Sequence, residues 1–448
     1  MKFIETCKNI WKIEDLRKRL LTTLLFVLIY RFGSFIVLPG VDASVLEEIS
    51  STHDQTRGGL LALLDMFSGG AFSNASIFAL GIMPYISASI IVQLLGIAVP
   101  YFQRLQKEGE SGYRKMNQIT RYLTVAILLF QGPSYLVNLQ AQMGSALPDS
   151  VGFNWFTISS TLILLAGSMF VMWLGERITD KGIGNGISFI ILIGIIARLP
   201  GAIVQEFTAR LNNAGGGLIV FLAEIVALIL VIAVAIMLVQ GTRKIPVQYA
   251  KRIVGNKQYG GVRQYIPLKV NAANVMPIIF AQAIMFIPLA FVGFNSDGSG
   301  WFARNFLNNT GFWYNAVFFI LIILFTYFYT AIIINPTQIA ENLKLNNGFI
   351  PGVKPGKKTA EYIDDIMSKI TLPGSIFLAI VAILPAFAQK LGVSQSFAQF
   401  FGGTSLLIMV GVILDTLQQI ESHLLMRHYD GLLDSGSRIK GRTGVAAY

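Results

Sequence analysis

Ten long apolar stretches separated by charged loops constrain the fold of this chain more than any other feature of its sequence. Each has the roughly 17 to 25 residues that an α-helix needs to cross the hydrocarbon core of a bilayer. Of the 448 residues, 54% are hydrophobic and only 13% are charged. The sequence therefore predicts an all-α, polytopic membrane protein with ten transmembrane helices, near residues 20–38, 71–99, 122–140, 153–174, 183–200, 217–239, 271–293, 313–335, 371–389 and 401–420.

The basic residues predict how these helices are oriented. Most of the 35 Lys and Arg residues lie in six segments, 1–19, 100–121, 175–182, 240–270, 336–370 and 421–448. The intervening loops hold few Lys and Arg residues, so loops rich in basic residues alternate along the chain with loops poor in them. By the positive-inside rule, the basic segments and both termini face the cytoplasm. The N-terminal segment has no small-residue cleavage site before the first span, which argues against a removed signal peptide.

Two of the basic segments are longer and more charged than a simple connection requires. Segment 240–270 alternates apolar and polar positions around a YGG turn, a pattern that predicts a β-hairpin projecting from the membrane. Segment 336–370 has Gly and Pro turns followed by an amphipathic stretch. Two interpretations stay open: the loops only fix the topology, or they form a cytoplasmic docking surface for a large partner.

The spans hold few side chains suited to ion coupling or catalysis. Glu224 lies early in its span and Arg31 lies inside the first one, with a structural or a functional role open for each. An ion-coupled transporter, the first alternative function, needs a cluster of mid-membrane charges. A membrane-embedded enzyme, the second, needs a nucleophile and base or a metal motif, and neither occurs in the sequence. Cys7 is the only cysteine. We expect no catalytic residues, no metal site and no cofactor.

Seven segments of the sequence carry a resemblance to a known family. They are MFSGGAFSNASIFALGIMPYISASIIVQLL (66–95), KEGESGYRKMNQITRY (107–122), GERITDKGIGNGIS (175–188), IPVQYAKR (245–252), IPLKVNAANVMPIIFA (266–281), NPTQIAENLKLNNGFIPGVKPGKKTAEYIDDIM (335–367) and FGGTSLLIMVGVILD (401–415). They resemble the SecY family, the channel subunits of the bacterial protein-conducting translocon. The resemblance runs through nearly all ten spans in order, and segments 141–152, 255–264 and 294–312 fall outside it.

The resemblance implies two pseudo-symmetric five-helix halves around an hourglass pore. Its parts are a cytoplasmic amphipathic segment (1–19), an N-terminal half with spans 1 to 5 (20–200), a C-terminal half with spans 6 to 10 (201–420) and a cytoplasmic tail (421–448). The halves are hinged between spans 5 and 6. They open sideways to lipid between spans 2 and 3 of one half and spans 7 and 8 of the other.

The implied function is that of a gated channel in the bacterial inner membrane. It passes unfolded preproteins across the membrane and releases membrane-protein segments into lipid. The implied partners are the small membrane subunits SecE and SecG, the ATPase motor SecA, the translating ribosome, preproteins with their signal sequences, and membrane lipids.

A channel for polypeptides needs a seal against ions, and a ring of branched apolar side chains seals a constriction by dewetting it. Two pairs of isoleucines, on spans 2 and 5, are four residues apart and so share a helix face. The resemblance assigns these pairs and two further isoleucines to a pore ring, consisting of Ile82, Ile86, Ile187, Ile191, Ile279 and Ile408. From the pattern alone, the same residues also fit helix packing or lipid contact.

The stretch LLALLDMFSGG (60–70) is too short to cross the membrane, and it ends in residues that permit a hinge. The resemblance makes it the plug that closes the outer funnel at rest, with Leu64, Asp65, Met66, Phe67, Ser68, Gly69 and Gly70 as its site residues. An ordinary re-entrant or interfacial segment fits the stretch equally well.

The resemblance implies a lateral gate, and polar residues on span 2 are assigned to it. Ser87 and Gln93 lie on this span, and Gln282 on span 7 is expected to lie opposite Gln93. A polar contact inside lipid is worth about 1 kcal/mol, which is weak enough for a hydrophobic signal sequence to replace. Ordinary helix packing is the alternative role for these side chains.

Basic residues of the two long loops are the predicted docking site for the motor or the ribosome. The resemblance selects Arg243, Lys244, Lys251, Arg252, Lys354, Lys357 and Lys358. The family commonly has Arg at the position of Lys354. Since lysine lacks the planar fork of arginine, a bidentate contact is not expected there, whereas a charge contact is.

Overall fold

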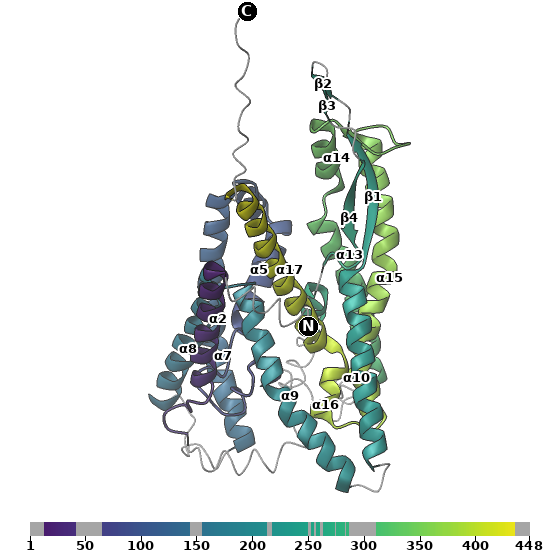
Figure 1. Cartoon of the computed structure of the whole chain (residues 1–448). Coiled ribbons are helices and arrows are strands. Elements are labelled where there is room, and N and C mark those ends of the chain that lie inside the picture. Colours follow the sequence, from purple (N-terminus) through teal and green to yellow (C-terminus); the bar gives the residue numbers. More distant parts are fainter. Residues whose placement is uncertain are drawn as a thin grey trace, which may run out of the picture.

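The chain forms a bundle of long helices with a small β-sheet at one end, as a computed structural model shows (Figure 1). The structure describes residues 13–41, 65–143, 155–212, 217–249, 252–254, 257–259, 263–273, 275–282, 284–285 and 311–434. We call the end of the bundle that carries the sheet the sheet end, and the other the opposite end.

The helices fall into two groups. The first helix group consists of α2 (Glu14–Gly33), α5 (Met83–Ala98), α6 (Pro100–Lys107), α7 (Glu110–Met143), α8 (Trp155–Lys181) and α9 (Gly186–Asn212). In it, α7 packs against α5 and α8, and α8 packs against α2 and α9. The second helix group consists of α10 (Gly217–Gln240), α13 (Phe312–Ile333), α14 (Pro336–Leu345), α15 (Lys357–Lys390), α16 (Gln395–Ala398), the 3-10 turn η2 (Gln399–Phe401) and α17 (Gly403–Asp434).

Helix α17 joins the two groups. It packs against α10 and α15 of its own group and against α9 of the first, and it runs between them in Figure 1. Two clusters of buried residues are distributed differently: one centres on α8 and α9 but also includes Phe397 and Ile408 of the second group, whereas the other includes residues of α10, α13, α15 and α17. Val171, Leu174 and Ile195 represent the core around α8 and α9, and Ile322 and Leu378 represent the core between α13 and α15. The arrangement is consistent with two halves that share one central helix.

The lengths and compositions of the helices suit a multi-pass membrane protein. Within the described ranges, six helices are long and apolar enough to cross a bilayer, and a seventh span results if α5 and α6, bent by 100°, count as one. Of the other predicted spans, 20–38 overlaps α2 and 122–140 lies inside α7. The span predicted at 271–293 is only partly described, with helix at 276–282 and 284–285.

The predicted antiparallel hairpin is confirmed, but its turn is not at the YGG, because Tyr259 lies in a strand and pairs with Arg252. Strand β1 (Thr242–Tyr249) pairs antiparallel with β4 (Arg263–Lys269), in a register that places Thr242 opposite Lys269. The short strands β2 (Arg252–Val254) and β3 (Lys257–Tyr259) pair with each other. Strand β1 also pairs with β5 (Gly348–Phe349), so the two long loops of the second helix group meet in one three-stranded sheet.

Two predicted boundaries are wrong. The span expected at 71–99 becomes helical only at Met83, because residues 71–82 form a run of turns in which Ala75 and Gly81 have positive φ. The loop expected at 336–370 includes the first turns of α15, which continues without interruption to Lys390. Hydropathy identifies only the part of a helix that lies in the hydrocarbon core of the bilayer. The helix itself can begin several turns before that part.

Candidate functional site

The six predicted ring isoleucines lie in one apolar cluster at the centre of the bundle. Ile82, Ile191 and Ile408 are buried in this cluster, with at most 5% of each residue exposed. Ile86, Ile187 and Ile279 are partly buried and pack against it. Ile82 directly precedes α5, and the others come from α5, α9, the segment 275–282 and α17, so both helix groups contribute to one apolar cluster.

The described part of the predicted plug packs into the same cluster. Met66 and Phe67 are buried among the ring isoleucines and their neighbours, while Leu64 lies outside the described residues. A β-carbon added at Gly194 of α9 would lie 2.6 Å from the Phe67 carbonyl oxygen. One added at Gly69 would lie 2.9 Å from the Gly194 α-carbon. Glycine is required at both positions because the two backbones touch. We call residues 65–70 the plug segment.

A charged network anchors the plug segment to α9. Asp65 forms an ion pair with Arg198, and its Oδ1 accepts hydrogen bonds from the backbone N of Ser73 at 2.8 Å and from Ser73 Oγ at 2.6 Å. Ser73 Oγ also accepts a hydrogen bond from Arg198 Nη2 at 2.7 Å. We call Asp65, Ser73 and Arg198 the plug latch. Charge-assisted bonds of this kind are about twice as strong as neutral ones.

Helix α2 holds the plug segment from another side. Tyr30 Oη donates to the Ser68 carbonyl oxygen at 3.1 Å, and Arg31 Nη1 donates to the Gly69 carbonyl oxygen at 2.9 Å. Arg31 also lies 5.2 Å from the centre of the Phe35 ring, within cation–π range. The intramembrane arginine singled out by the sequence therefore has its partners on the plug segment and on its own helix.

At the predicted lateral gate, α5 contacts α13. Tyr329 Oη donates to Gln93 Oε1 at 3.3 Å, and Gln93 Nε2 donates to Ser89 Oγ, also at 3.3 Å. Ser87 is partly buried on the same helix. The polar side chain that the structure places against Gln93 across the two helix groups is thus Tyr329, a residue that sequence reasoning missed.

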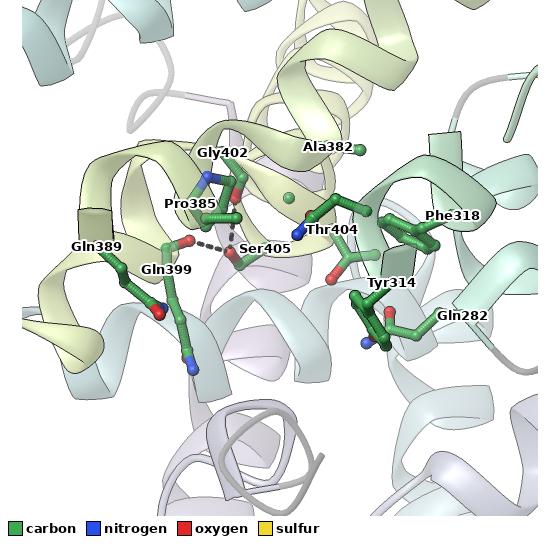
Figure 2. Close-up of a pocket in the computed structure, with 13 residues that line it drawn as sticks. Gln282, Tyr314, Phe318, Ala382, Pro385, Gln389, Gln399, Gly402, Thr404 and Ser405 are labelled. Carbon is green, nitrogen blue, oxygen red and sulfur yellow. Dashed lines mark hydrogen bonds between the residues drawn. The ribbon is translucent and has the colours of Figure 1, made fainter. Parts of the chain in front are cut away.

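Gln282, the predicted partner of Gln93, lies instead in a pocket within the second helix group (Figure 2). The cavity, of about 80 Å³, is lined by uncharged side chains that include Tyr314, Gln389 and Thr404. Ser405 closes one wall by donating a hydrogen bond from Oγ to the Gln399 carbonyl oxygen at 2.6 Å. The cavity has room and hydrogen-bonding groups for a few water molecules.

The described docking residues lie at the sheet end, on the surface. Arg243 and Lys244 are exposed on β1, and Lys354, Lys357 and Lys358 are exposed around the start of α15. Arg252 is the first residue of β2, and Lys251 lies outside the described residues. Beneath the surface, Ile245, Val247 and Leu268 of the sheet pack against α14 and α15. The shared core brings the two basic loops into one surface.

Comparison with known proteins gives this arrangement a family. The model of the SecY family matches residues 76–417 of the chain. The chain belongs to the SecY family. A SecY-family relative from Streptomyces scabiei, named protein translocase subunit SecY, is 44% identical over 437 residues, which cover 94% of this chain and 98% of the relative.

Solved structures show that the fold is shared as well. One described as "The structure of a protein conducting channel" matches with a TM-score of 0.63 at 17% identity, over 91% of this chain and 92% of the other. A second, described as "The plug domain of the SecY protein stablizes the closed state of the translocation channel and maintains a membrane seal", matches with a TM-score of 0.61 at 18% identity and the same coverage.

Sequence reasoning missed the plug latch as well as Tyr329. Arg198 is one of few basic residues outside the six basic segments, at the end of a predicted span, and this isolation was the only signal available. Its partners Asp65 and Ser73 lie more than 120 residues away in the sequence. Such pairings follow from the tertiary fold and not from local spacing.

Proposed function

We propose that this chain is the pore subunit of a protein-conducting channel that passes unfolded preproteins across the bacterial inner membrane and releases hydrophobic segments sideways into lipid. The observation that carries the proposal is the convergence of six isoleucines from both helix groups onto Met66 and Phe67 of the plug segment. An apolar constriction of this kind excludes hydrated ions because water leaves it. It offers no hydrogen bonds that a particular substrate must match, which suits passage of many sequences.

Two further features support a gated channel. The plug segment is held by the plug latch and by Tyr30 and Arg31, so a defined set of polar contacts closes the pore at rest. At the lateral gate, the bond between Gln93 and Tyr329 is neutral and 3.3 Å long, a contact that an inserting apolar helix can replace. The relatives and solved structures with the same fold are described as translocase subunits and channels, which supports the same role here.

The proposed partners and orientation follow from charge. The exposed lysines and arginines of the sheet end are proposed to dock the SecA motor or the acidic RNA of a translating ribosome. This end and both termini are proposed to lie in the cytoplasm, which the positions of the basic segments support. SecE and SecG are proposed as the small membrane subunits, and the apolar outer faces of the helices as the surface for lipid. The channel performs no chemical step, and the energy for transport comes from the motor or the ribosome.

Reconstitution tests this function directly. Proteoliposomes that contain the chain with SecE and SecG should import an unfolded preprotein into a protease-protected lumen when SecA and ATP are added. Vesicles without the chain, and complete vesicles without ATP, are the controls. Protection no greater than in vesicles that lack the chain would refute the proposal.

A further inference from the structure

A buried charge cluster lies where the chain crosses from the first helix group to the second. Helix α9 ends at Asn212 and α10 begins at Gly217, and both ends lie at the opposite end of the bundle (Figure 1). Ile195 and Ala202 of α9 belong to the central cluster, which also includes residues of the second group such as Phe397. Ala235 of α10 belongs to a separate cluster within the second group. The chain therefore passes from one group to the other at this connection.

Arg210 is the centre of the cluster. Its Nε donates to Glu206 Oε1 on the same helix at 2.9 Å. Its Nη2 donates to Glu224 Oε1 of α10 at 2.5 Å and to the Gly392 carbonyl oxygen at 2.8 Å. Glu206 Oε2 in turn accepts a hydrogen bond from the backbone N of Ser394 at 2.8 Å. Three pieces of backbone, α9, α10 and the turn between α15 and α16, are thus joined by one guanidinium and two carboxylates.

The cluster is sheltered from water. Glu206 is 1% exposed and Glu224 is 8% exposed. Next to them, Phe207 of α9 packs edge to face on Phe221 of α10, with 5.3 Å between the ring centres. Charged hydrogen bonds gain strength in such surroundings, and the loss of one partner leaves the other buried without compensation.

The opposite side of the pore is joined much more weakly. Among the described residues, the hydrogen bond that links α5 to α13 at the gate is the neutral one between Gln93 and Tyr329. The cluster around Arg210 supplies three hydrogen bonds between the helix groups, and each involves a charged group. When the two helix groups separate, the contact between α5 and α13 therefore breaks first, and the contacts between α9 and α10 persist.

We propose that Arg210, Glu206 and Glu224 form a hinge clamp, which keeps α9, α10 and the turn at 391–394 together while the two helix groups part at the gate. The inference rests on the proposed channel function, because it assigns the axis about which that channel opens. Arg210 is a positioning residue in this scheme, since it contacts neither the ring nor the described docking residues. Without the clamp, the two groups also separate on the hinge side.

Spin-label distances between the groups test the clamp. In a Cys7→Ser background, one pair of labels is placed across the groups at the exposed residues Trp155 and Leu391. A second pair, at Trp155 and Leu211, reports on the first group alone. In nanodiscs that contain the chain with SecE and SecG, Arg210→Gln should broaden the distance distribution of the first pair and leave the second pair unchanged. The matched control is Lys369→Gln, which removes an exposed ion pair with Asp365 and should change neither.

Two outcomes of that experiment overturn the proposal. An unchanged distance across the groups means that Arg210 does not hold the hinge. Broadening of both pairs means that Arg210 only maintains the fold of the first group. The distance measurement does not depend on transport. A channel that imports preprotein but whose distances do not change as expected therefore refutes the clamp and leaves the proposed channel function intact.

A double variant separates bridging from charge balance. Arg210→Gln leaves two buried carboxylates without a cation, and adding Glu224→Gln removes one of them. The double variant should regain thermal stability, whereas the distribution across the groups stays broad, because no side chain of α9 then bonds to Glu224 or Gly392 and only the hydrogen bond from Ser394 to Glu206 remains. Arg210→Lys should give a distance distribution across the groups that is narrower than that of Arg210→Gln but broader than that of the unmodified channel. The reason is that an ammonium lacks the planar fork with which arginine makes three contacts. A narrow distribution in the double variant would contradict the clamp.

Discussion

At the scale of single residues, we propose that the ring isoleucines seal the channel, because their branched apolar side chains offer water neither space nor hydrogen-bond partners. Ile82→Gly combined with Ile86→Gly removes two of these side chains from the cluster. We expect a clear rise in the resting ion conductance of the reconstituted channel, because water fills the widened constriction. Planar-bilayer recordings measure this conductance.

The matched control is Ile91→Gly on the same helix, where the side chain is 40% exposed. It carries a similar cost in helix propensity, of about 1 kcal/mol, and should leave the conductance unchanged. Equal leaks in the control and the double variant would mean that the ring does not form the seal.

A second prediction at this scale concerns the plug latch. Arg198→Ala removes the ion-pair partner of Asp65 and the donor to Ser73. Hydrogen bonds to charged groups contribute about 1.5–3 kcal/mol, and exposure of the Arg198 side chain at 36% favours the lower value. We expect the plug segment to leave the pore about ten times more often, which single-channel recordings detect as more frequent opening.

Arg114→Ala is the control for the latch, because it breaks an exposed ion pair with Glu110 on α7. It should not change the opening frequency. The exchanged pair Asp65→Arg with Arg198→Asp should restore part of the closure. No difference between Arg198→Ala and the control would show that other contacts keep the plug segment in place.

At the scale of helices and strands, the proposed gate is the contact between α5 and α13. Tyr329→Phe keeps the ring and removes the hydrogen bond to Gln93. This bond contributes about 1 kcal/mol inside the membrane, so opening should become about five times more favourable. Import of a preprotein with a weakened signal sequence should rise accordingly, as a protease-protection assay measures.

Tyr122→Phe on α7, where the tyrosine is 75% exposed, controls for the loss of a hydroxyl group. Import of the same preprotein should match the unmodified channel in this variant. An equal rise in import in both variants would mean that the hydrogen bond between Tyr329 and Gln93 does not control opening of the gate.

The elements also show what the sequence could predict. The long apolar helices and the β1–β4 hairpin follow from local patterns, hydropathy in one case and alternation around a turn in the other. The start of α5 at Met83 does not, because residues 71–82 are as apolar as a span and are kept out of a helix by turns and by contacts with distant elements. Tyr135, for example, donates a hydrogen bond to the carbonyl oxygen of Phe72 at 2.8 Å.

The residues of the candidate site could likewise be predicted from the sequence only in part. The isoleucine ring could be assigned because the resemblance to a family supplied the tertiary arrangement, and the structure brings those six residues into one cluster. The plug latch and the hinge clamp depend on which ionisable side chains meet across 120 or more residues or across a helix connection. Apart from the i, i+4 pair of Glu206 and Arg210, spacing along the sequence does not predict these contacts.

At the scale of the whole molecule, the basic sheet end is a single electrostatic surface. Replacing Lys354, Lys357 and Lys358 with glutamate should weaken binding of SecA to membranes that contain the channel. The unmodified channel should itself lose affinity as salt rises, because exposed charges are screened within about 10 Å at 0.1 M ionic strength. Co-sedimentation with proteoliposomes over a salt series measures both effects.

Lys390→Glu is the control for this surface, since Lys390 is an exposed lysine at the other end of α15. SecA binding should be unaffected in that variant. A triple variant that binds as well as the control at every salt concentration would exclude these lysines from docking.

Helix α15 gives the molecule a mechanical connection across its full depth. It runs for 34 residues, from Lys357 among the docking lysines to Lys390 beside the turn of the hinge clamp, a length of about 51 Å at 1.5 Å per residue. Its first turns share a core with the β-sheet, through Ile363 and Met367. A partner that pulls on the sheet therefore also pulls on α15, which ends two residues before Gly392. Force applied at the sheet end thus reaches the opposite end of the bundle through one continuous helix.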